Sequence, residues 1–140
     1  IRGATRITDE LTGASWLPMG YVDDMASAYA AADLMVARSG AGTVVETATV
    51  GLPTIYVPLP HGNGEQARNA TSAVDAGAGV VVANADLDVE RLLAETARIH
   101  DADVLAQMSA AGRGLMPAHA AEEMAVRVIS AATSIDPTIG

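Results

Sequence analysis

The sequence lacks cysteine and phenylalanine, and all eight of its basic residues are arginine. Without cysteine the chain can form neither a disulfide framework nor a thiolate metal site, which fits a cytosolic protein. It has only four aromatic residues, so alanine, valine and leucine must do most of the packing. The absence of these residue types favours a compact α/β domain with small side chains.

Positive charge is also scarce, because the formal net charge is −9. A surface this acidic repels nucleic acid and anionic lipid, so neither is expected as a partner. No apolar run approaches the ~20 residues of a membrane-spanning helix. We therefore expect no membrane contact from this chain.

With 140 residues, the chain is long enough for one hydrophobic core and too short for two ordinary domains. Its first residues do not look like a signal peptide, and we expect a piece cut from a longer protein. Residues 1–134 are expected to form a partial domain, and residues 135–140 a loose tail.

Three short apolar runs predict buried strands at residues 34–37, 54–57 and 79–83. Each run is continuous rather than alternating, as expected for strands of a parallel sheet covered on both faces. Helical segments at about 42–51 and 65–77 separate them, giving two βαβ units. The predicted fold is α/β, a Rossmann-like parallel sheet with flanking helices. Right-handed crossovers place both βα loops at the carboxyl edge, where such sheets bind ligands.

The flanking segments are less regular. Residues 1–14 are small and polar and indicate a loop or frayed helix. Residues 15–22 indicate a strand, with Pro18 placing it at an edge or breaking it. Asp23 or Asp24 is expected to cap a helix that ends at Ala32.

Three further helices are expected to pack on the sheet. They are predicted from Asp86 or Asp88 to Ile99, from Val104 to Ala111 with Gly112 and Gly114 as its boundary, and from Ala120 to Ala132. Their expected inward residues are Leu92, Leu93, Thr96 and Ile99 in the first of these helices, and Met124, Val128, Ile129 and Ala132 in the last.

The loop from Arg38 to Thr43 contains almost no side-chain bulk, since Ser39 is followed by Gly40, Ala41 and Gly42. A small-residue loop that leads from a strand into a helix lets backbone N–H groups approach an anion. It is a candidate diphosphate site. The same residues could instead serve only to start the helix, with Ser39 as its N-cap or with Thr43 and Glu46 as a capping box. The pattern matches neither GxGxxG nor a P-loop.

Glu46 lies one turn beyond Thr43, so its carboxylate can accept hydrogen bonds from the vicinal hydroxyls of a ribose. Glu65, Gln66 and Asn69 open the next helix, and Asn69 can share a face with either neighbour. Amides suit a sugar because they both donate and accept. An ordinary polar first turn is the alternative.

Other polar residues are weaker candidates. His61 has no carboxylate partner that the sequence reveals, so we do not predict it to be a general base. Helix capping explains Asp23 and Asp24 more simply than a metal pair does. Arg38 could clamp the diphosphate or pin its loop by pairing with a carboxylate, and it is not predicted to be catalytic. The histidines lack ligand spacing, so no metal site is expected.

These motifs together resemble the MurG-type family of bacterial glycosyltransferases. The resemblance is strong over about residues 20–83. It rests on Tyr21 to Met25, Tyr29 to Asp33, Arg38 to Thr43 with Glu46, Gly51 to Pro53, Val57-Pro58, His61, Glu65-Gln66 and Asn69-Ala70.

The resemblance implies a two-domain GT-B enzyme that transfers N-acetylglucosamine from UDP-GlcNAc to lipid I, making lipid II for peptidoglycan with inversion at the anomeric carbon. This chain resembles most of the C-terminal, donor-binding domain. The lipid I site and any general base are implied to lie on the N-terminal domain, so no catalytic residue is expected here and the chain alone is expected to be inactive. No cofactor is implied. The parent enzyme would be cytoplasmic and peripheral to the inner face of the cell membrane.

The family's donor site, carried over residue by residue, implies base contacts first, then diphosphate, ribose and sugar contacts. One familiar form of the sugar motif has Gln-Gln where this sequence has Glu65-Gln66, which puts a donor contact at position 65 in doubt. The implied substrate-binding residues, in chain order, are Val22, Met25, Ser39, Gly40, Ala41, Gly42, Thr43, Glu46, Glu65, Gln66 and Asn69.

Two other interpretations stay open. The chain could belong to another GT-B enzyme that uses a UDP-sugar, such as a different glycosyltransferase or an epimerase. It could also be a non-catalytic module that binds a nucleotide sugar.

Overall fold

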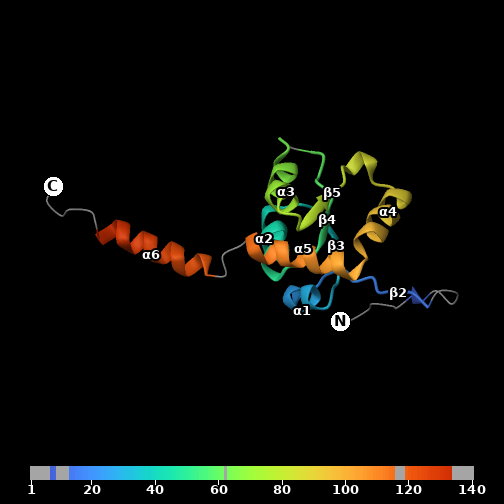
Figure 1. The fold of residues 1–140 in the computed structure, drawn as a ribbon, viewed down its shortest axis with the longest axis horizontal. Coiled ribbons are helices and arrows are strands. Elements are labelled where there is room, and N and C mark those ends of the chain that lie inside the picture. Colours follow the sequence, from blue (N-terminus) through green and yellow to red (C-terminus); the bar gives the residue numbers. More distant parts are fainter. Residues whose placement is uncertain (1–6, 9–12, 62, 116–118, 134–140) are drawn as a thin grey trace. The chain divides into compact units, whose positions relative to one another are not determined.

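The computed structural model describes residues 7–8, 13–61, 63–115 and 119–133 (Figure 1). The chain divides into two compact units, residues 1–31 and 32–140, and each is considered by itself. The expected tail at 135–140 lies outside the described residues. The single-domain boundary at residue 134 stays a prediction.

The first unit contains a short antiparallel pair of strands, β1 (Ile7–Thr8) and β2 (Ser15–Trp16). Two hydroxyls face each other across this pair, with Thr8 Oγ1 3.2 Å from Ser15 Oγ. The predicted strand over 15–22 is therefore wrong beyond residue 16. Pro18 explains the early end, because it has no N–H to donate to a neighbouring strand.

Helix α1 (Met25–Ala30) completes the first unit. Asp24 is its N-cap, accepting hydrogen bonds from the Ser27 backbone N–H at 3.0 Å and the Ser27 hydroxyl at 2.6 Å. Both bonds favour the ionised carboxylate and lower the pKa of Asp24. The helix-cap interpretation of Asp24 is confirmed, although the helix ends before the expected Ala32.

The second unit is built on a three-stranded parallel sheet in the order β3 (Met35–Ala37), β4 (Thr54–Tyr56), β5 (Gly79–Val81). Helix α2 (Ala41–Val50) crosses from β3 to β4, and α3 (Glu65–Asp75) crosses from β4 to β5. The predicted α/β class and parallel βαβ order are confirmed. Figure 1 shows α2 and α3 on one side of the sheet and α4 on the other.

The elements after the sheet are a 3₁₀ turn, η1 (Asn84–Asp86), and helices α4 (Val89–Ile99), α5 (Ala102–Leu115) and α6 (Ala120–Thr133). Asp88 caps α4 by accepting from the Arg91 backbone N–H at 2.7 Å. The predicted glycine boundary of α5 is wrong, because the helix runs through both glycines. Packing against α2 outweighs the weak helix propensity of glycine there.

Successive residues of β4 face opposite layers, as the strand pleat requires. Tyr56 packs with Val44, Ala70 and Ala73 in the layer made by α2 and α3, and its hydroxyl lies 2.8 Å from Thr47 Oγ1. A buried phenol needs such a partner to offset its desolvation. This bond joins the sheet to α2 directly.

Ile55 faces the other layer, where it packs with Val82, Ile99 and Met108. Leu92 is partly buried against this cluster, whereas Leu93 is 64% exposed, so the prediction of an inward Leu93 is wrong. Neighbouring positions differ by about 100° around a helix, and only one of the two leucines can face the sheet.

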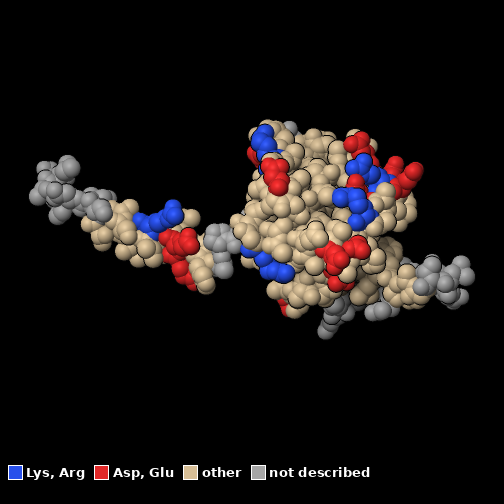
Figure 2. Space-filling view, in the orientation of Figure 1, with Lys and Arg blue, Asp and Glu red and all other residues tan. Residues whose placement is uncertain are grey.

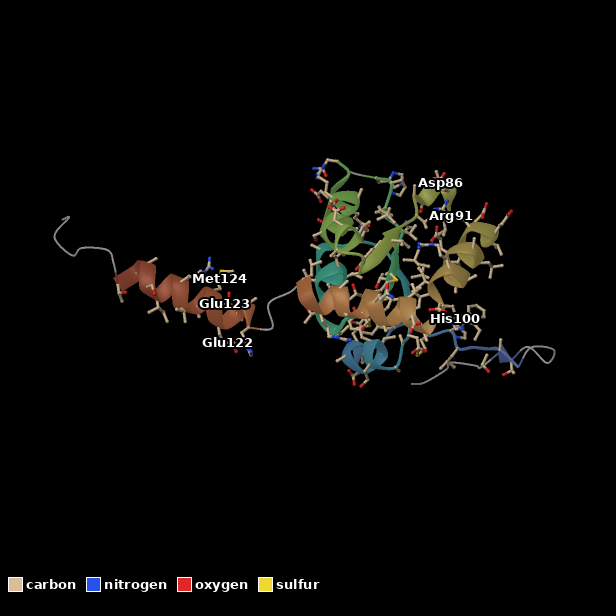
Figure 3. The ribbon with its side chains drawn as sticks, in the orientation of Figure 1. Asp86, Arg91, His100, Glu122, Glu123 and Met124 are labelled. Carbon is tan, nitrogen blue, oxygen red and sulfur yellow. The ribbon has the colours of Figure 1, made fainter. Side chains whose placement is uncertain are left out.

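Helix α6 has no buried residue over its fully described length. Met124, which Figure 3 labels beside Glu122 and Glu123, is 66% exposed, and Val128 and Ile129 are exposed to a similar degree. The predicted inward face of this helix is wrong within this chain. An apolar stripe indicates that a helix can pack, but it does not specify a partner. Within the described ranges, no helix has both the length and the apolar content needed to cross a membrane.

The two glycines of α5 provide a matched test of its packing on α2. A Cβ at Gly112 would lie 3.1 Å from the Ala48 carbonyl oxygen, whereas a Cβ at Gly114 would meet nothing within 4 Å. We predict that Gly114→Ala raises the free energy of unfolding by about 0.5–1 kcal/mol through helix propensity.

Gly112→Ala should instead lower the free energy of unfolding by about 1 kcal/mol or more, because α5 must move away from α2. Urea unfolding followed by circular dichroism measures both variants. Stabilisation by both substitutions would contradict the close packing.

Candidate functional site

The small-residue loop lies where β3 ends and α2 begins, at the carboxyl edge of the sheet. Gly40 is the N-cap of α2, in an extended conformation with φ −61° and ψ 149°. The two capping interpretations, Ser39 as the N-cap and Thr43 with Glu46 as a capping box, are therefore wrong. Because glycine has no side chain, the N-cap residue leaves the first N–H groups of α2 uncapped.

Ser39 is fully buried, with 0% of its surface exposed. Its Oγ is the one buried side-chain polar atom among the described residues that has no hydrogen-bond partner. Its backbone carbonyl, by contrast, accepts a hydrogen bond from Asn69 Nδ2 at 3.1 Å. An unpaired buried hydroxyl costs free energy, so its presence beside an uncapped helix start calls for an explanation.

Two polar side chains of α2 point back toward this loop. A Cβ added at Gly40 would lie 3.9 Å from Thr43 Oγ1, and one added at Gly42 would lie 3.9 Å from Glu46 Oε1. Helical side chains lean toward the N-terminus, so this direction is the ordinary one. The structure therefore gathers the predicted diphosphate residues and the predicted ribose ligand at one helix start.

Arg38 joins the ends of all three strands. Its Nη1 donates to the carbonyls of Val57 at 3.1 Å and Pro58 at 3.3 Å, and to Asn84 Oδ1 at 2.7 Å. The prediction that Arg38 pins its loop is confirmed, but the expected carboxylate partner is wrong. Two carbonyls and an amide take its place.

The predicted sugar ligands open α3, which lies beside α2. Gln66 Oε1 accepts from the Leu59 backbone N–H at 2.9 Å, and Asn69 donates to the Ser39 carbonyl. Both amides are half-buried, whereas Glu65 is exposed. These backbone contacts could not be predicted from the sequence, because a backbone partner such as the Leu59 N–H does not depend on residue type.

Val22 and Met25 belong to the first unit, so their predicted contacts with a base stay predictions. His61 is exposed in the loop before α3. His100 follows the last residue of α4 (Figure 3). In the described part of the chain, no three histidine, aspartate or glutamate side chains are placed to hold a metal ion.

Charged side chains gather over α4, at the upper right of Figure 2. Arg91 and Arg98 both pair with Glu95, at 2.9 and 2.7 Å. The hydrogen bond from Arg98 is the main reason that the pKa of Glu95 is lowered. These pairs at i, i+4 and i, i+3 stabilise the helix and give no indication of a second site.

Comparison with known proteins identifies the class. The model of the glycosyltransferase family 28 C-terminal domain matches residues 8–125 of this chain. The chain therefore belongs to this family, and the small-residue loop and the start of α3 lie within the matched region.

Individual relatives narrow the comparison. The chain is 47% identical over 117 residues to the UDP-N-acetylglucosamine--N-acetylmuramyl-(pentapeptide) pyrophosphoryl-undecaprenol N-acetylglucosamine transferase of a Nocardioides strain, a match covering 83% of this chain and 32% of that protein. It is 55% identical over 97 residues to the transferase of the same name from Mycolicibacterium paratuberculosis, covering 69% of this chain and 24% of that protein.

A crystal structure of Acinetobacter baumannii MurG matches with a TM-score of 0.74 and 29% identity, over 80% of this chain and 34% of that one. The expected family and the GT-B C-terminal fold are thereby confirmed. The chain spans about a third of the length of the Nocardioides transferase and of the MurG structure.

The hydrogen bonds of Arg38 predict that this side chain contributes to the free energy of unfolding. Arg38→Met should lower the free energy of unfolding by about 1–3 kcal/mol, because two backbone carbonyls and Asn84 lose a charged donor. Arg113→Met is the matched control, since Arg113 makes a single long bond of 3.3 Å to the Val50 carbonyl. Its expected cost is below about 1 kcal/mol. Equal losses in urea unfolding would contradict the pinning role of Arg38.

Proposed function

We propose that this chain is the donor-binding part of an inverting glycosyltransferase that moves N-acetylglucosamine from UDP-GlcNAc to lipid I, giving lipid II for peptidoglycan. The observation that carries the proposal is the uncapped start of α2 beside the unpaired Ser39 hydroxyl. A diphosphate at this position accepts hydrogen bonds from both, and the helix dipole favours its negative charge.

The same helix start would assist the reaction. When the acceptor hydroxyl attacks the anomeric carbon, the bond to UDP breaks and negative charge grows on the departing diphosphate. Backbone N–H groups of Gly42 and its neighbours are fixed in place before the reaction, so they stabilise this charge without reorganisation. Binding that strengthens in the transition state accelerates the transfer.

Other residues contact the ribose, the sugar and the uracil of the donor. Glu46, whose carboxylate lies near Gly42, accepts hydrogen bonds from the ribose hydroxyls. Glu65, Gln66 and Asn69 lie at the start of α3 and contact the sugar. The segment that contains Val22 and Met25 lies against the uracil.

The acceptor site belongs to parts of the parent protein outside this chain. The similar transferases are named for an acceptor that carries a pyrophosphoryl-undecaprenol lipid. A lipid acceptor of this kind puts the parent enzyme at a membrane, and we infer the cytoplasmic face, where UDP-GlcNAc is available. The general base is assigned to the same missing part.

An amide NMR titration of this chain with UDP-GlcNAc, UDP-glucose and UDP tests the proposal. We expect shifts confined to residues near 22, 40–46 and 61–69, larger for UDP-GlcNAc than for UDP-glucose. Glu46→Ala should weaken binding of all three ligands by about tenfold, the equivalent of one hydrogen bond to a charged group.

Glu90→Ala, which removes an exposed glutamate from α4, is the control and should leave binding unchanged. A well-dispersed spectrum that none of the ligands moves would contradict a donor site formed by this chain.

A further inference from the structure

The β3–β4 hydrogen-bond ladder ends at two identifiable backbone groups. Its outermost bonds run from Met35 N to the Pro53 carbonyl at 3.0 Å and from Val57 N to the Ala37 carbonyl at 2.8 Å. In a parallel pair, the residues that bond across the ladder recur at every second position. The next two bonds of the ladder would therefore run from the Ser39 N–H to the Val57 carbonyl and from the Leu59 N–H to the Ser39 carbonyl. The Val57 carbonyl accepts from Arg38 Nη1 at 3.1 Å instead.

In the structure, α3 supplies a separate partner for each of these groups. The Leu59 N–H donates to Gln66 Oε1 at 2.9 Å, and the Ser39 carbonyl accepts from Asn69 Nδ2 at 3.1 Å. Gln66 and Asn69 are three residues apart on α3, so they share a face of the helix. Two amides from one helix thus replace one bond of the sheet.

We propose that Gln66 and Asn69 are positioning residues that hold the β3–β4 ladder open at this point, with Asn69 fixing the backbone of the small-residue loop. If the strands paired further, Ser39 would be drawn into an extended ladder and the turn into α2 would change. The pairing with α3 removes that option while the Leu59 N–H and the Ser39 carbonyl each keep a hydrogen-bond partner. The ligand consequences of this proposal rest on the proposed function.

The backbone contacts also fix how the two amides are oriented. An N–H can only donate and a carbonyl can only accept, so the amide oxygen of Gln66 and the amide nitrogen of Asn69 must face the backbone. The polar groups that remain are the Gln66 NH₂ and the Asn69 oxygen. Gln66 is therefore left to donate to a ligand, and Asn69 to accept from one.

Two substitutions of the same chemical kind separate positioning from direct sugar contact. Asn69→Asp replaces the donor to the Ser39 carbonyl with an acceptor, so that bond is lost. Gln66→Glu keeps an acceptor for the Leu59 N–H and loses only the NH₂ group. Each substitution adds one negative charge near the same loop, so general repulsion of an anionic ligand is matched.

Ligand-free amide NMR spectra and UDP affinity are the readouts, because UDP has no sugar for these amides to contact. We expect Asn69→Asp to move the resonances of residues 39–42 in the absence of ligand and to weaken UDP binding by about tenfold, the equivalent of one lost hydrogen bond. Gln66→Glu should leave those resonances in place and weaken UDP only by the charge repulsion that both variants share, with a further loss for UDP-GlcNAc.

A second control accounts for general destabilisation. Ile99→Val thins the core on the other face of the sheet and should lower the melting temperature without moving resonances 39–42. If Asn69→Asp does not fold, Asn69→Ala removes the same donor without adding charge and is judged by the same resonances.

The positioning role is overturned if the Asn69 variant leaves resonances 39–42 in place, or if both charged variants weaken UDP equally. If the unsubstituted chain binds neither UDP nor UDP-GlcNAc, the proposed function fails. The ligand-free resonances then decide the positioning role by themselves.

Discussion

Beyond the last backbone hydrogen bonds between the strands, the structure of the sheet's carboxyl edge depends on which side chains bond to the remaining backbone groups. Buried N–H and C=O groups need partners, and Pro58 has no N–H with which to continue the β4–β5 ladder beyond the bond from Val82 N to the Tyr56 carbonyl. Side chains take over from there: Arg38 donates to the Val57 and Pro58 carbonyls, and two amides of α3 pair with the Leu59 N–H and the Ser39 carbonyl. Hydrogen bonds from side chains thus replace backbone hydrogen bonds between strands, and this replacement determines the shape of the candidate site.

Helix α2 is held to the sheet by a different set of contacts. Thr47 Oγ1 bonds to Tyr56 and also to the Thr43 carbonyl at 2.8 Å, while Val44 packs in the same layer. These buried contacts lie on one side of the helix. Glu46 is therefore directed by the packing of its neighbours, so the site and the core share a single element.

The sequence was sufficient to predict the sheet and the crossover helices, because strands buried on both faces leave continuous apolar runs that are separated by helix-length segments. It was also sufficient for the family, since the motifs from Arg38 to Asn69 occur at characteristic spacing. It was insufficient for the start of α2, where Ser39 has the composition of a cap and is instead buried. Local propensity cannot report burial, and neither Leu59 nor Asn84 reveals a long-range partner from its residue type.

One consequence concerns insertions and deletions in the loop before α2. Adding or removing one residue there turns a helix by about 100° relative to the strand that precedes it. Because Val44 and Thr47 are locked into the core, α2 cannot turn to absorb such a change, and the added length must bulge at Gly40. Surface loops usually tolerate changes in length, but this short connection is fixed in its residue count as well as in its small side chains.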